Sequence, residues 1–563
     1  MLGVGVGIIQ PVARAVVPSL DLTLLSGADP RISFTRASTA TRFNRSGLLA
    51  TVAADVARFD YNPATPSGIT GQERVSNGDF TVDTSGWNAL QGGVIDVDGG
   101  QLRLVSGAAN YGGAQQTVTG LTAGKRYLIT WKARKDNAAP AWLIVSGIVA
   151  GVTNNIVNTS ASLQAYSLEV QPTGTSISLT CQCQNAIGST AWFDDISVRE
   201  LAFAPRGLLL EEARTNLLLW SRDFTNAAWE KTDVTPTLNQ IGIDGGANTA
   251  CLITEGVAGV AALAQAGQAV TAGVTITGSV VLKRGNTDWV RVLAVETNLT
   301  NGAQAWFNLA TGAKGTVNPR GAGTSFTSSI ESLGNGFYRC SVSCIPDGTY
   351  TVPKIYTVSA SADNSTTRVN GATYIADCAQ IEVGAFATSI IPTTSAAVTR
   401  AADVPAMTGT NFSSWYNQAA GTLEVEFEPT PPAGTGVVQY AACISDGTSA
   451  NRIFLRRATA GGSDSAVVNA SVFLGPANPA TVMAAKTVSR IAMAYDNGGA
   501  ATAAVNGTNG GPSSAMAVPN TMTRLDIGSG PGGASAPLNG WIRGVKYYNT
   551  RLPDAVLTAL TAG

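Results

Sequence analysis

The sequence predicts an all-β protein built from several β-sandwich modules. Apolar and polar residues alternate in stretches such as "RYLITWKAR" (126–134), "SISLTCQCQ" (176–184) and "GTLEVEFEP" (421–429), as in strands with one buried face. Gly, Asn, Asp and Pro residues that favour turns separate these stretches. Helical periodicity is scarce. The clearest helix is the final "RLPDAVLTALTAG", with Pro553 and Asp554 in its first turn.

Composition excludes several classes of function. The chain has 563 residues, enough for several domains with a core each. Its formal net charge of −1 and its lack of any Lys/Arg-rich run give no reason to expect nucleic-acid binding. It contains no histidine, so Ser-His-Asp or Cys-His catalysis and His-ligated metal sites are excluded. An enzyme built on this chain would have to use carboxylates, Lys, Tyr or Ser.

The seven cysteines form no CxxC motif. Cys181 and Cys183 share one strand face, where side chains two residues apart lie about 6–7 Å apart, too far for easy bridging. Cys340 and Cys344 are further apart still. We therefore expect core cysteines in a protein assembled in a reducing cytoplasm, rather than a redox role.

The N-terminal stretch "MLGVGVGIIQPVARAVVP" is interpreted as neither a signal peptide nor a membrane anchor. It has no basic region, and Pro11 interrupts it early. No later run reaches the ~18 apolar residues that a membrane helix needs, so no membrane insertion is expected. A docking peptide for a larger assembly and a disordered tail are both open interpretations of this stretch.

Two segments of the chain resemble each other. The first opens with "VSNGDFTVDTSGWN" (75–88) and closes with "STAWFDDISVREL" (189–201). The second opens with "LLWSRDFTNAAWEK" (218–231) and closes with "NGATYIADCAQIEVG" (370–384). Each begins with an Asp-Phe pair and a nearby Trp, and each ends in a strand with an aromatic residue and an aspartate. The two units resemble the jelly-roll carbohydrate-binding modules of glycan-active proteins.

The C-terminal part differs from both units. "GTLEVEFEP", "SRIAMAYDNGGAATAAVNG" (489–507) and "LNGWIRGVKYYNTRLPDAVLTAL" (538–560) resemble the concanavalin A-like, laminin-G-like lectin sandwich. The strand "NGWIRGVKYYNTRL" followed by a short helix is the most specific feature of this resemblance.

A split segment carries the strongest resemblance. "SFTRASTATRFNRSGLLATVAADVARFDYNP" (33–63) and "PRGLLLEEARTNLLLWSRDFTNAAWEK" (205–231) together resemble a segment of tailed-phage and prophage fibre or receptor-binding proteins, where a short turn joins the halves. The first jelly roll is expected to be inserted at that turn, because surface turns tolerate insertions. The expected parts are an extended N-terminal virion-attachment segment (1–67), the inserted jelly roll (68–202), a second jelly roll (203–404) and the lectin sandwich (405–563).

The stretch "GLLLEEARTNLLLW" (207–220) allows two structures. It could form an amphipathic helix with Glu211, Glu212 and Arg214 on a solvated face. However, its apolar residues flank a charged centre without clean helical spacing, and the resemblance implies an extended segment. We expect the extended form, in which Arg214 makes a structural ion pair with a glutamate.

Three tryptophans are the best candidates for sugar binding: Trp142, Trp289 and Trp306. A pyranose ring places apolar C–H patches on an exposed aromatic face and offers hydroxyls to flanking polar side chains. Burial in a sandwich core is the alternative for each of them. Other tryptophans stand at motif positions typical of the core: Trp87, Trp192, Trp229 and Trp541.

The resemblance to jelly-roll modules implies a structural calcium ion where the first and last strands meet, with Asp79 and Asp195 as ligands. In the second unit, Asp223 and Asp377 occupy comparable places, but the pair formed by Asp194 and Asp195 has no counterpart there. The alternative for these residues is hydrogen bonding in turns and at strand ends. No other cofactor is expected.

Glu424, Glu426 and Glu428 allow a glycosidase interpretation, because concanavalin-like glucanases carry acidic pairs on a strand. A retaining hydrolase needs two carboxyls about 5–5.5 Å apart, one of them with a raised pKa. Strand alternation predicts instead that Leu423 and Val425 are buried and that the glutamates point into solvent. We therefore predict no catalytic residues.

Together these features predict a non-catalytic phage fibre or spike protein on the exterior of the virion. It would bind host cell-surface polysaccharide, contact other virion proteins through its N-terminal segment, and form a homo-oligomer, a trimer as in the fibres it resembles. Weak sites on several copies would add up on a repeating glycan. One alternative is a polysaccharide depolymerase, against which stands the lack of β-helix-like repeats. Another is a purely structural virion part, such as a head fibre or tail adaptor.

Overall fold

The computed structural model describes residues 17–25, 27–107, 111–136, 140–149, 155–184, 187–257, 260–431, 437–459, 461–533 and 535–562. Antiparallel strands dominate them, which confirms the all-β prediction. The helices in these ranges are α1 (Thr410–Ser413), η1 (Pro531–Gly533) and α2 (Asp554–Ala562), and α2 is the predicted C-terminal helix. None of the helices described is long and apolar enough to cross a membrane.

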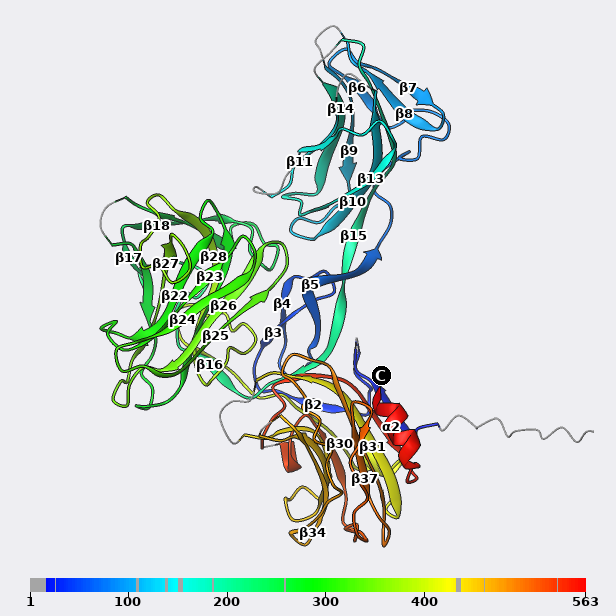
Figure 1. Cartoon of the computed structure of the whole chain (residues 1–563), viewed down its shortest axis with the longest axis vertical. Helices are drawn as coiled ribbons and strands as arrows, with labels where there is room; N and C mark the ends of the chain where they lie inside the picture. The colour runs from blue at the N-terminus through cyan, green and yellow to red at the C-terminus, as the bar shows by residue number, and fades with distance from the viewer. Residues whose placement is uncertain are drawn as a thin grey trace, which may run out of the picture. The chain divides into compact units, whose positions relative to one another are not determined.

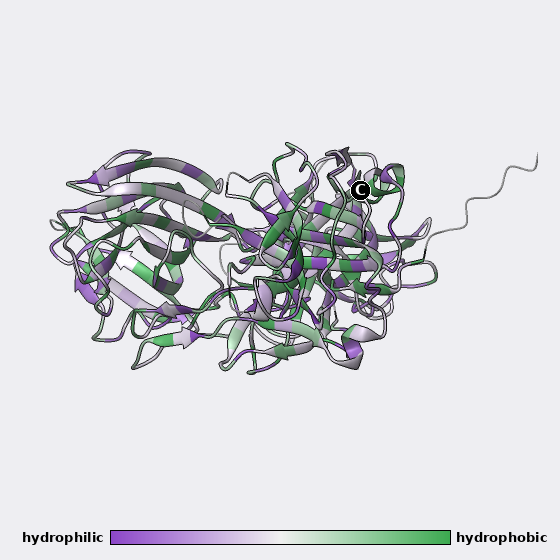
Figure 2. Cartoon of the chain, turned by 90° about the horizontal axis from the view of Figure 1, so that it is seen from below, coloured by the Kyte–Doolittle hydropathy of each residue, from purple (hydrophilic) through white to green (hydrophobic). Residues whose placement is uncertain are grey.

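The chain forms two compact units. One is residues 36–403, and the other joins 404–563 to the described part of 1–35. Figure 2 shows the strands banded in hydrophilic and hydrophobic colours along their length, the alternation on which the sandwich prediction rests. All seven cysteines are unpaired and buried, as expected of core residues.

The first jelly roll consists of two antiparallel sheets. One has the order β7-β8-β15-β10-β13 and the other β12-β11-β14-β9-β6. The core between them contains Trp87, as predicted, whereas Trp192 lies partly exposed beneath the guanidinium of Arg134, 3.7 Å from the ring centroid. The strands are β6 (Asn88–Leu90), β7 (Val94–Asp98), β8 (Gln101–Val105), β9 (Tyr111–Thr119), β10 (Tyr127–Lys135), β11 (Ala141–Ser146), β12 (Asn155–Asn158), β13 (Gln164–Val170), β14 (Ser176–Gln184) and β15 (Thr190–Leu210).

A two-stranded ribbon connects this jelly roll to the rest of its unit. The chain enters on β5 (Phe59–Thr70) and returns on β15, with Phe59 opposite Leu208 and Ile69 opposite Leu201. Figure 1 shows the two strands side by side, leading to the first jelly roll. The ribbon thereby brings the two halves of the split segment together.

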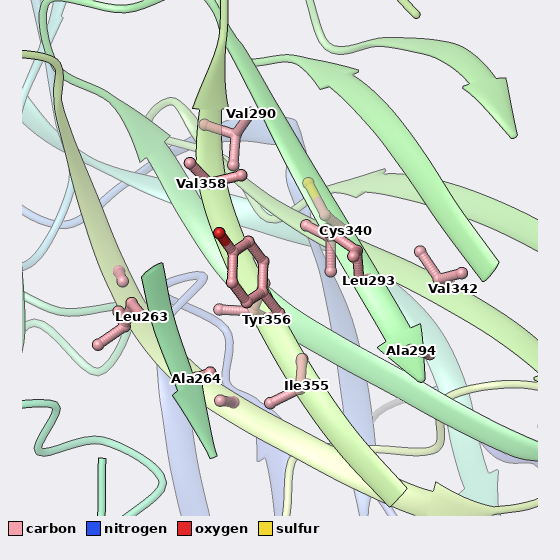
Figure 3. Close-up of a cluster of buried hydrophobic side chains, with 14 of the residues drawn as sticks. Leu263, Ala264, Val290, Leu293, Ala294, Cys340, Val342, Ile355, Tyr356 and Val358 are labelled. Carbon is pink, nitrogen blue, oxygen red and sulfur yellow. The ribbon is translucent and has the colours of Figure 1, made fainter. Parts of the chain in front are cut away.

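The second jelly roll also has two sheets, in the orders β17-β20-β27-β22-β23-β24 and β18-β19-β28-β21-β26-β25. Trp229 is buried in the core between them, as expected, and Figure 3 shows part of this core. The strands are β17 (Glu230–Thr232), β18 (Val234–Gln240), β19 (Ala250–Glu255), β20 (Ala262–Ala266), β21 (Ile276–Arg284), β22 (Trp289–Glu296), β23 (Gly302–Asn308), β24 (Ala313–Arg320), β25 (Thr324–Ser332), β26 (Phe337–Ile345), β27 (Pro353–Ala360) and β28 (Thr373–Val383).

The stretch 207–220 is extended, as predicted. It completes β15 and continues into β16 (Arg214–Asn216), which pairs with β29 (Val398–Arg400). Arg214 forms the expected ion pair, and its Nε donates to Oε1 of Glu212 at 2.7 Å. The short hairpin of β3 (Ala40–Phe43) and β4 (Leu49–Val52) also belongs to this unit.

The other unit is a sandwich of two sheets. One runs β1-β40-β31-β36-β37-β38 and the other β2-β30-β39-β32-β33-β34-β35. Trp541 is buried in it, as expected. The strands are β1 (Leu20–Thr23), β2 (Ser33–Thr35), β30 (Val404–Thr408), β31 (Ala420–Pro429), β32 (Gln439–Ser445), β33 (Arg452–Arg457), β34 (Ser463–Asn469), β35 (Val472–Leu474), β36 (Ser489–Asp496), β37 (Thr502–Val505), β38 (Thr508–Asn509), β39 (Arg524–Ile527) and β40 (Gly540–Tyr548).

The expected N-terminal segment 1–67 is divided between the two units. Strands β1 and β2 complete the sheets of the C-terminal sandwich by pairing with β40 and β30. Strands β3, β4 and β5 belong to the unit of residues 36–403. The N-terminal stretch for which a docking peptide and a disordered tail were both open falls mostly on residues 1–16, which lie outside the described residues.

Candidate functional site

One face of the sheet β17-β20-β27-β22-β23-β24 carries a polar pocket. Strand register places Glu230, Ala264, Tyr356, Leu293 and Gln304 in one row across this sheet. Residues paired across antiparallel strands project to the same side, so the row forms part of a single surface. Figure 3 shows Tyr356 of β27 between Ala264 of β20 and Leu293 of β22.

The pocket has a volume of about 260 Å³. This is smaller than the ~300–1,000 Å³ of sites that enclose drug-sized ligands, so it suits a small group such as one sugar ring. Ala264, Leu293 and Tyr356 supply its apolar floor. Its charged lining consists of Glu230, Arg291, Arg320 and Lys354.

Two arginines of the pocket converge on one neutral acceptor. Nη1 of Arg291 and Nη1 of Arg320 donate to Oε1 of Gln304, at 3.4 and 3.3 Å. Nε of Arg291 is buried without a hydrogen-bond partner. Burial lowers the pKa of Arg291; Tyr356 opposes this shift and the positive charge of Arg320 adds to it. The guanidinium of Arg291 is therefore incompletely satisfied within the protein.

Arg320 has a second acceptor, because its Nε and Nη2 donate to the carbonyl of Leu299 at 3.2 and 3.0 Å. Three further polar side chains of the pocket also have partners. Nζ of Lys354 lies 2.6 Å from Oε2 of Glu230, and the lysine is buried while the glutamate is exposed. The hydroxyl of Tyr356 donates to the carbonyl of Ala261 at 2.5 Å, and burial raises the pKa of Tyr356. The phenol therefore stays neutral at neutral pH, and its oxygen keeps the capacity to accept a hydrogen bond.

Trp289 and Trp306 lie on the same sheet face as the pocket, because Trp306 is opposite Arg291 and Trp289 is two residues before it on β22. Trp289 is partly exposed. Trp306 is only 1% exposed, and its indole N–H donates to the carbonyl of Ser365 at 2.7 Å. It therefore cannot present the open ring face on which its selection rested.

Trp142 belongs to a different site. It is partly exposed on β11 of the first jelly roll, opposite Gln182 of β14, and its indole nitrogen has no hydrogen-bond partner among the described residues. The amide of Gln182 donates to Oε1 of Gln91 at 2.8 Å. The structure thus places Trp142 in another module from Trp289 and Trp306.

Of the two aspartates expected to hold calcium, Asp195 is paired with a lysine, and both Asp79 and Asp195 lie near enough to Asp194 to affect its pKa. Oδ2 of Asp195 is 2.6 Å from Nζ of Lys132. Burial raises the pKa of Asp194, and the negative charges of Asp195 and Asp79 add to that shift. Within the part of the chain described, no group of three or more His, Cys, Asp or Glu side chains is placed to hold a metal ion.

The comparable aspartates of the second unit serve structural roles. Asp377 is buried and accepts from Nε and Nη2 of Arg222, at 2.8 and 2.9 Å. Asp223 accepts from the backbone N–H of Thr225 at 3.0 Å, as aspartates do in turns.

The glutamates of β31 do not form the solvated face that alternation predicted. Glu424 is 5% exposed, one of its oxygens has no hydrogen-bond partner, and burial raises its pKa. Glu426 accepts from Nε of Arg490 at 3.1 Å and from Nε of Arg543 at 2.8 Å. The prediction was wrong because the flanking strands carry long basic side chains, including Lys546, on this same face. A cavity of about 120 Å³ lies here.

Among known proteins, no family model and no curated protein matches the sequence. Among solved structures, the CBM40 module of the Ruminococcus gnavus IT-sialidase, bound to α2,3-sialyllactose, matches with a TM-score of 0.23 and 18% identity over 27% of this chain and 88% of that one. A tandem pair of CBM22 modules from Paenibacillus barcinonensis matches with a TM-score of 0.21 and 14% identity over 57% and 100% of the two chains. These similar structures are carbohydrate-binding modules, and at such TM-scores the likeness carries no argument about a ligand.

Proposed function

We propose that this chain binds glycans without cleaving them, and that the pocket on the β17-β20-β27-β22-β23-β24 sheet is a binding site. The observation that carries the proposal is an apolar floor of Leu293 and Tyr356 next to Arg291, whose guanidinium is incompletely hydrogen-bonded within the protein. A sugar ring offers the complementary surfaces, because its C–H groups can cover the floor while its oxygens accept hydrogen bonds.

Non-catalytic binding is the chemistry that the pocket lining supports. Hydrolysis of a glycosidic bond generally uses two carboxyl groups on either side of the scissile bond. Glu230 is the one carboxylate among the described residues that line the pocket, and it is already paired with Lys354. Among the described lining residues the pocket therefore offers a guanidinium donor for a sugar and a single carboxylate, rather than an acid–base pair.

In the organism, we propose that the protein is a receptor-binding part of a phage fibre or spike, on the exterior of the virion. The support is the split segment that resembles such proteins, whose halves come together at the β5–β15 ribbon. Host-surface glycan would be the partner, and a homotrimer would multiply weak individual sites. Contact with other virion proteins would run through the N-terminal segment.

A second candidate function, polysaccharide hydrolysis, has one observation in its favour. Glu424, with its raised pKa, is two residues from Glu426 on β31 and lines the same cavity. A carboxyl with a raised pKa beside a second carboxyl is the arrangement that acid–base hydrolysis uses. Against it, Glu424 is nearly inaccessible and Glu426 is paired with two arginines.

The test incubates the full-length protein with bacterial cells of several surface types and with polysaccharide extracted from each. Retention and sugar-chain length are scored together, for the native protein, for Leu293→Asp in the pocket, and for Lys314→Gln on the exposed part of β24 as a matched control. We expect retention with unchanged chain length, loss in Leu293→Asp and no change in Lys314→Gln, with circular dichroism and a melting curve to verify folding.

Two results would contradict the proposal. Shortened polysaccharide chains would support hydrolysis, and Glu424→Gln should then abolish the shortening. Binding to a capsid or tail protein, with no retention on any envelope fraction, would support a purely structural virion part.

A further inference from the structure

We infer that the ligand of this pocket is an acidic glycan whose sugar carboxylate is held by Arg291 and Arg320. This inference rests on the proposed function, since it names the class of glycan that the same pocket takes. It follows from the balance of charge in the pocket and from the incomplete hydrogen bonding of the Arg291 guanidinium.

The pocket has more cations than anions. Three of its lining residues are cationic, Arg291, Arg320 and Lys354, and one is anionic, Glu230. Lys354 and Glu230 neutralise each other at 2.6 Å. Within the described residues neither arginine forms an ion pair, so the pair of guanidiniums leaves two uncompensated positive charges.

Several buried or partly buried arginines of the same unit have carboxylate partners. Arg58 and Arg400 pair with Glu211, and Arg222 pairs with Asp377. Placing two guanidiniums together is costly without an anion, because their charges repel and partial burial removes water. Such a site on a binding surface is suited to an anion that the ligand supplies.

The geometry favours a planar, bidentate anion. Nη1 of Arg291 and Nη1 of Arg320 both donate to the single oxygen of Gln304 through long hydrogen bonds of 3.4 and 3.3 Å. The Nε and Nη2 groups of Arg320 donate to the backbone carbonyl of Leu299, so its Nη1 is the group that would turn to a ligand. A guanidinium pairs a carboxylate through two parallel N–H···O bonds, which are shorter and about twice as strong as neutral ones. A sugar carboxylate would therefore be preferred to the Gln304 amide oxygen by both side chains.

The apolar floor favours a sugar acid over a small free anion as the ligand. Leu293 and Tyr356 lie in the same row of the sheet as Gln304 and line the pocket together with Leu299. A free anion such as phosphate would leave this surface uncovered, whereas a uronic acid would place its ring C–H groups on it. The two features together indicate a uronic-acid-type sugar within a longer glycan.

The experiment compares one polymer in two charge states, because the rest of its chemistry then stays constant. Immobilised polygalacturonate and its carboxyl-reduced derivative are the probes, with dextran sulfate and a phosphorylated dextran as alternative anions. The proteins are the native chain, Arg291→Gln, Arg320→Gln, and Lys314→Gln as a control that removes a cation from β24 outside the pocket lining. Melting curves verify that each variant is folded.

We expect retention on polygalacturonate that falls roughly 10- to 100-fold on the reduced polymer and in either arginine variant, the effect of losing one or two charge-assisted hydrogen bonds. Lys314→Gln should bind like the native protein. Equal binding to native and reduced polymer, lost in Leu293→Asp, would overturn the acidic assignment while glycan binding stands. Stronger binding to dextran sulfate or phosphorylated dextran than to polygalacturonate would overturn the assignment of the anionic group as a carboxylate. Failure to bind any of these polymers or any extracted polysaccharide would overturn the proposed function itself.

Discussion

Nη1 of Arg58 lies 2.8 Å from Oε2 of Glu211, although 153 positions of sequence separate the two residues. Arg58 also pairs with Asp403, which accepts from Nη1 of Arg36 at 2.9 Å, and Arg400 pairs with Glu211. All of these residues are buried. The network joins the chain before the first jelly roll to the chain after it and to the end of the second.

Removing the charge of Glu211 should strongly destabilise the protein. Glu211→Gln would leave Arg58 and Arg400 short of a buried carboxylate, and breaking a buried ion network from one side costs about 3–5 kcal/mol. Chemical denaturation followed by tryptophan fluorescence measures the loss. Asp96→Asn, which breaks a half-exposed ion pair with Arg103, is the control and should change the midpoint little. Equal midpoints for both variants would contradict this account.

The contribution of Glu211 should depend on pH. Burial opposes its ionisation, but the charges of Arg400 and Arg58 and hydrogen bonds from Ser389 lower the pKa to about 2, from 4.5. A carboxyl with a depressed pKa in the folded state stabilises the fold above its unfolded pKa. The difference in stability between native protein and Glu211→Gln should be full above about pH 4.5 and shrink as the pH falls towards about 2. Denaturation curves between pH 3 and 7 measure it, and a constant difference would argue against the shift.

Trp306 should support the fold rather than contact ligand directly. Its ring is buried and its N–H bonds to Ser365, so Trp306→Ala should cost about 3–5 kcal/mol. Trp306→Phe keeps most of the volume, and its retention on polysaccharide per folded molecule should match the native protein. Thermal melting and the retention assay measure the two effects. A folded Trp306→Phe variant that no longer binds would show that the indole acts in recognition.

The cysteines should be inert in the folded protein. All seven are buried, and burial raises the pKa of the Cys181, Cys183 and Cys378 thiols, which suppresses the reactive thiolate. A thiol reagent should label none of them in the native protein and all seven in guanidinium. Reducing agent should leave the melting temperature unchanged. Rapid labelling of the native protein would reveal an opening that exposes the core.

Local sequence pattern was sufficient for the fold class, because the alternation at 126–134 and 176–184 directly reflects one buried strand face. The same pattern could not predict which side chains of neighbouring strands cover the opposite face of a strand. Glu424 was expected in solvent because alternation assigns sides but does not reveal neighbours such as Lys546. In the same way Trp306 is covered by a segment 59 residues further along the chain.

The pocket on the second jelly roll could not be predicted from local sequence pattern. Arg291, Arg320 and Lys354 stand on three strands, β22, β24 and β27, and only the pairing register brings them together. One local signal existed, since Lys354 is a cation in the otherwise uncharged and wholly buried strand "PKIYTVSA". A charge in such a strand indicates a partner or a site.

The β5–β15 ribbon also has a consequence for the gene. The polypeptide enters and leaves the first jelly roll on paired strands, so residues 68–202 form an insert whose two ends lie opposite each other in the fold. In-frame exchange of the coding segment, with one crossover at each of its ends, would replace this module and leave the residues of the Arg58–Glu211 network and of the pocket on the second jelly roll unchanged. Sequence changes can thus accumulate in the first jelly roll without changes in the rest of the molecule.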